Sequence, residues 1–165
     1  MNIVHTIWSS LLVIQRGIMI LSSSLILLGL GVTVVLRYVF QTGLHGLEEL
    51  IIIPAFWMYF IGAAYGTYKK EHITADILSV YLKGEKKRLW LKVIISLINC
   101  SLISIFAFWS IEYIIWSINS GAHSNVWKYP MYIPQSSILV GFGLMTLYTF
   151  VDLVKGIVNL YRYKT

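Results

Sequence analysis

The amino-acid sequence predicts an all-α integral membrane protein with four transmembrane helices in two hairpins. Of its 165 residues, 58% are hydrophobic and only 12% are charged, whereas soluble domains carry about 25% charged residues. Four uncharged runs, at residues 17–36, 50–68, 93–111 and 129–151, each approach the roughly 20 residues that cross a bilayer core. We therefore expect one membrane domain that spans the whole chain, residues 1–165.

The distribution of basic residues predicts how the helices are oriented. Four crossings place both termini and the central connector on the same side of the membrane. All of the thirteen Lys and Arg residues except Arg37 and Lys128 fall on that side. Because Lys and Arg remain in the cytoplasm during insertion, the termini and the connector are predicted to be cytoplasmic.

The net charge of +6 points to membrane lipids as partners and not to nucleic acid. The basic residues cluster beside apolar spans and are not interleaved with base-stacking aromatic residues in a soluble domain. Anionic lipids of the inner leaflet attract such a basic segment.

The first hairpin begins with residues 1–15, whose apolar side chains recur at helical spacing. They are predicted to form an amphipathic helix that lies in the membrane interface. The first transmembrane helix, residues 15–36, is followed by a turn with two glycines and by the second helix, residues 50–68. Within that second helix, Gly62 and Gly66 form a small-xxx-small pattern. This pattern predicts a face that packs closely on protein, either the chain's own helices or a partner.

Three charged residues mark the outer end of this hairpin. Glu48 and Glu49 open the second helix, where negative charge complements the positive end of the helix dipole. Arg37 is the only cation on this side of the hairpin, so it is placed to pair with either glutamate. The alternative is that all three are solvated interface charges, which contribute little to stability.

The basic connector, residues 69–88, is predicted to contain an in-plane helix. His72 and Asp76 lie four residues apart on its polar stripe, where a hydrogen bond between them is favoured. A metal half-site is the alternative, but no third ligand lies nearby. Residues 89–116 and 134–154 form the second transmembrane hairpin, in which Gly141 and Gly143 permit a close helix contact.

The spans lack the residues on which membrane chemistry depends. No Asp, Glu, Lys, Arg or His lies near the centre of any run, although ion relays and proton-coupled sites are built from such groups. The four histidines all fall outside the runs. We therefore predict a non-enzymatic protein without a cofactor, a metal site, or catalytic or substrate-binding residues. The alternatives are a small haem or redox membrane protein that uses loop histidines, and a self-assembling four-helix protein of unrelated function.

Several short segments, in their order and spacing, resemble the small permease subunit of TRAP (tripartite ATP-independent periplasmic) transporters, of the DctQ/SiaQ type. The resemblance covers nearly the whole chain. The segments that carry it are Arg37-Tyr38-Val39-Phe40, Glu48-Glu49-Leu50, Trp57 with Gly62, and His72-Ile73 with Asp76.

The resemblance implies a scaffold role in the bacterial inner membrane. The partner would be a large permease subunit that binds substrate and sodium and moves like an elevator. A periplasmic substrate-binding protein would deliver an organic acid, of the sialic acid or dicarboxylate class, and would touch the outer loops only slightly. His72 and Asp76 would order the connector. The candidates for the partner interface are Arg37, Glu48, Glu49, Trp57, Gly62 and Gly66.

Overall fold

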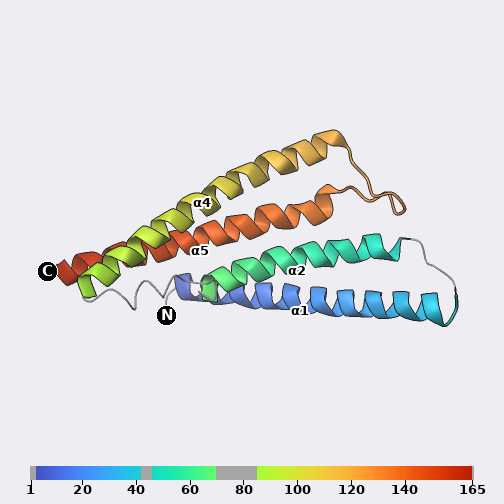
Figure 1. Ribbon diagram of the computed structural model, residues 1–165, viewed down its shortest axis with the longest axis horizontal. Coiled ribbons are helices and arrows are strands. Elements are labelled where there is room, and N and C mark those ends of the chain that lie inside the picture. Colours follow the sequence, from blue (N-terminus) through green and yellow to red (C-terminus); the bar gives the residue numbers. More distant parts are fainter. Residues whose placement is uncertain (1–2, 42–45, 70–84, 165) are drawn as a thin grey trace.

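The computed structural model describes residues 3–41, 46–69 and 85–164, and these form an all-helical structure with four long helices. Each of the four helices is long and apolar enough to cross a membrane. The predicted fold class, an all-α membrane protein, is therefore confirmed (Figure 1). The helices are α1 (Ile3–Tyr38), α2 (Leu47–Lys69), α4 (Glu85–Ser120) and α5 (Tyr132–Lys164).

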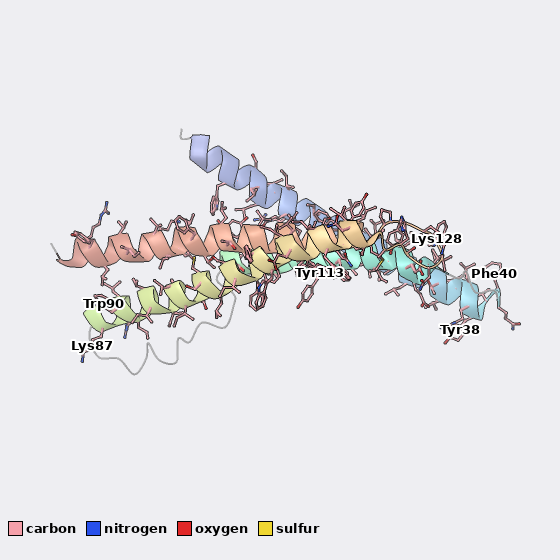
Figure 2. All side chains as sticks on the ribbon, turned by 90° about the horizontal axis from the view of Figure 1, so that it is seen from above. Tyr38, Phe40, Lys87, Trp90, Tyr113 and Lys128 are labelled. Atoms are coloured by element: carbon pink, nitrogen blue, oxygen red, sulfur yellow. The ribbon has the colours of Figure 1, made fainter. Side chains whose placement is uncertain are left out.

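The four helices lie side by side in the order α1, α2, α5, α4 (Figure 1). The inner pair, α2 and α5, therefore joins the two hairpins, and α1 and α4 flank it. We call the end where α1 and α4 begin the terminal end, because both chain termini lie there, and the opposite end the loop end. Figure 2 shows Lys87 and Trp90 at the terminal end, and Tyr38, Phe40 and Lys128 toward the loop end.

Helix α1 is continuous from Ile3 to Tyr38, so the segment predicted to lie in the interface continues without a break into the first predicted membrane span. No proline interrupts it. Part of the apolar face of this segment is covered by other helices of the chain. Trp8 and Leu11 pack against the buried cluster that contains Ala64 and Tyr148, so this face contacts the protein itself.

The two hairpins approach each other closely at Gly141 of α5. A Cβ atom at this position would lie 2.7 Å from Cβ of Phe60 and 3.0 Å from its carbonyl oxygen. Small residues permit such backbone contacts between membrane helices. The predicted contact is thus present at Gly141, whereas Gly143 has nothing within 4 Å of its Cβ position.

The outward faces of α1 and α4 remain exposed. Only 6% of the most apolar window of α1, and 0% of that of α4, is buried within the chain. Apolar surface of this extent requires lipid or a second membrane protein to cover it.

Candidate functional site

The loop end holds a set of contacts between the two hairpins that centres on Glu49, the third residue of α2. Its carboxylate accepts a hydrogen bond from the backbone N–H of Val126 at 3.1 Å, and a longer one from the N–H of Trp127 at 3.5 Å. Both donors belong to the loop between α4 and α5. A carboxylate is a charge-assisted acceptor for backbone N–H groups, and the shorter bond, from Val126, is the stronger of the two.

Two aromatic side chains of the same loop reach back to the start of α2. Trp127 donates its indole N–H to the carbonyl oxygen of Gly46 at 2.9 Å. The Tyr129 hydroxyl donates to the carbonyl oxygen of Glu49 at 2.8 Å. Burial and the neighbouring Glu49 carboxylate raise the pKa of Tyr129, so the phenol keeps the proton that it donates. We call Gly46, Glu49, Val126, Trp127 and Tyr129 the loop-end junction.

Gly46 is suited to this junction by its missing side chain. Its φ of 105° lies in a region that L residues rarely adopt, and a Cβ would sit 2.7 Å from Cγ1 of Val126. Its carbonyl oxygen also accepts the N–H of Glu49 at 3.1 Å, as the residue before a helix does for the first hydrogen bonds of that helix. Gly46 therefore does two things: it accepts the first hydrogen bond of α2, and its missing side chain leaves space for the second hairpin.

The α4–α5 loop is held in shape by its own backbone. The N–H of Ser124 donates to the carbonyl oxygen of Tyr129, and the N–H of Met131 to that of Ala122, both at 2.9 Å. This segment is therefore an ordered structure that presents Val126 and its neighbours to Glu49.

The predicted charge pairing at this end is not the one that the structure shows. Among the described residues, Arg37 forms no ion pair with Glu48 or Glu49, and the Glu49 carboxylate points to the α4–α5 loop. Arg37 and Glu48 are exposed, as the alternative of solvated charges predicted for them. Sequence reasoning treated the first hairpin alone and so missed the acceptor role of Glu49 toward the second.

The remaining site candidates are separated from this junction. Trp57 is half-buried in α2. The Cβ position of Gly62 lies 3.8 Å from the sulfur of Met19 in α1, and that of Gly66 has nothing within 4 Å. Of the two glycines in the small-residue pattern, Gly62 therefore lies against α1, and Gly66 has no neighbour within this chain. His72 and Asp76 lie outside the described residues.

The terminal end has a second set of contacts, which the sequence did not predict. Gln15 of α1 is 2% exposed, and its amide donates to the Tyr148 hydroxyl of α5 at 2.6 Å. Trp8 packs edge-on against Tyr148, with ring centroids 5.2 Å apart. The guanidinium of Arg16 donates to the Tyr65 hydroxyl at 3.0 Å. A glutamine inside an apolar helix was the available signal, because a buried amide requires a partner.

Replacement of Tyr148 by phenylalanine tests this second set of contacts. The change leaves the buried Gln15 amide without its partner, and we expect it to lower the free energy of unfolding by on the order of 1 kcal/mol. Thermal melting of the purified protein in detergent measures the loss. Tyr59→Phe is the control, because Tyr59 is 70% exposed. Equal melting temperatures for the two variants would contradict the role of this hydrogen bond.

The described residues contain no group of three or more His, Cys, Asp or Glu side chains that could hold a metal ion. His123 lies in the α4–α5 loop, where Nδ1 of its ring is 2.5 Å from the carbonyl oxygen of Gly121. In the described residues, the contacts at the loop end and at the terminal end hold the two hairpins together.

Comparison with protein families identifies a family to which most of the chain matches. A family described as "Tripartite ATP-independent periplasmic transporters, DctQ component" matches residues 26–159. The matched region includes all of α2 and α4, the loop-end junction and most of α5. Comparison with curated proteins gives no match.

Proposed function

Because the chain belongs to the DctQ family of tripartite ATP-independent periplasmic transporter components, we propose that it is the static scaffold of such a transporter. As the small membrane subunit of this transporter class, it is a multi-pass protein of the inner membrane. In the proposed complex it binds the large permease subunit, and the large subunit handles the substrate and the coupling ion. The small subunit catalyses no reaction itself.

The observation that supports the proposal is that the two hairpins contact each other at three positions along the length of the helices. The loop-end junction joins them at one end, and the bond from Gln15 to Tyr148 joins them near the other. Between these positions, Gly141 brings α5 against Phe60 of α2. A pair of hairpins connected in this way is suited to stay rigid while a partner subunit moves.

The outward faces of α1 and α4 supply the proposed contact with the large subunit. Their apolar side chains are widely exposed, with Leu27 at 73% and Phe108 at 59%. A stable protein interface buries at least about 1,200 Å² of total surface, and helices of 36 residues are long enough to offer that area. Trp57 and Gly66 of α2 remain candidates for the same interface.

The charged candidates divide into two groups under this proposal. Arg37 and Glu48 are exposed at the loop end, so they are available to a partner. Glu49 holds the two hairpins together, so it supports the interface without having to touch the partner. The proposed role of His72 and Asp76 is to order the connector.

The transport reaction proposed for the whole complex is sodium-driven uptake of an organic acid of the sialic acid or dicarboxylate class. Residues 17–36 and 50–68 contain no charged side chain, which supports an ion site on the large subunit and not here. A periplasmic substrate-binding protein delivers the acid and contacts the loop end slightly. The terminal end is cytoplasmic in this proposal, since the basic residues gather there.

Co-expression tests the scaffold proposal. With a large permease subunit encoded beside it, the full chain should purify as a stable complex in detergent, and vesicles that contain the chain alone should show no solute uptake. Recovery only as a monomer or self-oligomer in the presence of that partner would count against the proposal. Uptake driven by the chain alone would refute it.

Reversal of the charge at Glu48 probes the partner side of the loop end. Because Glu48 is exposed and makes no contact in the junction, Glu48→Lys should cost the isolated subunit only its favourable interaction with the dipole of α2, about 0.3–1 kcal/mol. We expect the yield of the complex to fall several-fold, since a like-charge contact at an interface is unfavourable. Lys87→Ala, at the opposite end, is the control. Equal yields from both variants would remove Glu48 from the interface.

A further inference from the structure

A groove of about 380 Å³ opens at the terminal end, between α1, α2 and α5. Its lining combines aromatic rings with charged side chains from three helices. The residues on which the argument rests are Trp8, Tyr68, Lys69, Tyr148, Asp152 and Lys155. This groove is distant from the loop-end junction, and the proposed scaffold role does not explain it.

Three rings that contact one another form the aromatic wall of the groove. The centroid of Trp8 lies 5.2 Å from that of Tyr148 and 6.1 Å from that of Tyr68, and the two tyrosine rings are 5.6 Å apart. Tyr148 is only 2% exposed, and Gln15 holds its hydroxyl. The wall is therefore fixed by packing before any ligand arrives, which lowers the entropic cost of binding.

The charged side chains come from two neighbouring helices. Lys69 is the last residue of α2. Asp152 and Lys155 follow Tyr148 on α5 at spacings of four and seven residues, so the three share one face of that helix. Two ammonium groups and one carboxylate therefore border the same aromatic wall.

The position of the groove along the helices indicates a ligand from the level of the lipid headgroups. It lies where α2 ends at Lys69, with tryptophan and tyrosine beside it, and these residues favour the level of the lipid headgroups. A molecule that enters from this level carries its phosphate at the membrane surface. Lysine is a common phosphate ligand, and aromatic faces attract ammonium groups.

We propose that this groove binds the headgroup of a zwitterionic phospholipid. Lys69 and Lys155 bind the phosphate diester, and Asp152 binds the ammonium group together with the partly exposed rings of Trp8 and Tyr68. The acyl chains stay in the bilayer against the exposed apolar surface of the helices. A bound lipid of this kind would fill the space between the first hairpin and α5 at the terminal end.

Native mass spectrometry of the full chain in detergent, supplied with phosphatidylethanolamine, tests the proposal. The Lys69→Ala/Lys155→Ala variant should retain about tenfold less bound lipid than the wild type, since each basic residue at a membrane surface adds to lipid affinity. Lys87→Ala/Arg88→Ala is the matched control, because it removes two exposed basic residues at the start of α4. Equal retention by the two double variants would overturn the proposal.

Two further arms identify the headgroup and its source. Asp152→Asn should reduce retention of phosphatidylethanolamine and leave that of phosphatidylglycerol, which has no ammonium group, nearly unchanged. Equal loss of both lipids would refute the assigned role of Asp152. Soluble glycerophosphoethanolamine and inorganic phosphate should not displace the lipid at millimolar concentration. Displacement by either would show that the groove serves a soluble phosphate compound and would overturn the lipid assignment.

Discussion

Replacement of Glu49 by alanine is expected to release the α4–α5 loop from the start of α2. The Glu49 carboxylate accepts the backbone N–H groups of Val126 and Trp127, and alanine leaves both donors without that acceptor. We expect amide hydrogen exchange at these two positions to accelerate about tenfold or more, because local opening then costs less. Exchange measured by mass spectrometry on the purified subunit follows the change.

Two related variants separate this effect from a general loss of charge. Glu48→Ala removes the adjacent, exposed carboxylate and should leave exchange in the α4–α5 loop as in the wild type. Glu49→Gln keeps an oxygen acceptor but loses the charge, so its exchange should fall between those of the wild type and Glu49→Ala. Unchanged exchange at Val126 in Glu49→Ala would show that the carboxylate does not hold the loop.

The sequence predicted the helices well because membrane spans depend on local composition. The four uncharged runs lie within the four helices and their immediate flanks, and a bilayer leaves a helix few alternatives to internal hydrogen bonding. The helices extend beyond the predicted spans: the span at residues 89–116 lies within α4, Glu85–Ser120, and α1 begins at Ile3.

The contacts between the hairpins were harder to predict because they join distant parts of the chain. Glu49 and Val126 are separated by 77 residues, and Gln15 and Tyr148 by 133. Helical periodicity reports which residues share a face, and it gives no information on which helix covers that face. The pairing of Arg37 with Glu48 or Glu49 was therefore inferred from neighbours in sequence, and the structure gives Glu49 a partner in another hairpin.

The glycines show the same limit within a single helix. Gly141 and Gly143 are equally small and lie two residues apart, so they project to different sides of α5. Only the position of α2 distinguishes them: it places Phe60 against Gly141 and leaves Gly143 exposed. A small-residue pattern therefore predicts that a close contact is possible and does not predict which glycine makes it.

Gly141→Leu is expected to destabilise the subunit by overpacking the contact between α2 and α5. A Cβ at this position meets Cβ of Phe60 at 2.7 Å and its backbone carbonyl at 3.0 Å, and a rotamer change of Phe60 moves neither atom away. Overpacking of this kind costs about 1–3 kcal/mol or more, so thermal melting in detergent should shift down by several degrees, with aggregation. Gly143→Leu adds the same side chain on an open face and should melt as the wild type does. If both variants melted alike, α2 and α5 would not meet at Gly141. The hairpins would then lack the contact at the middle of the helices, and the rigidity on which the scaffold role depends would lose that support.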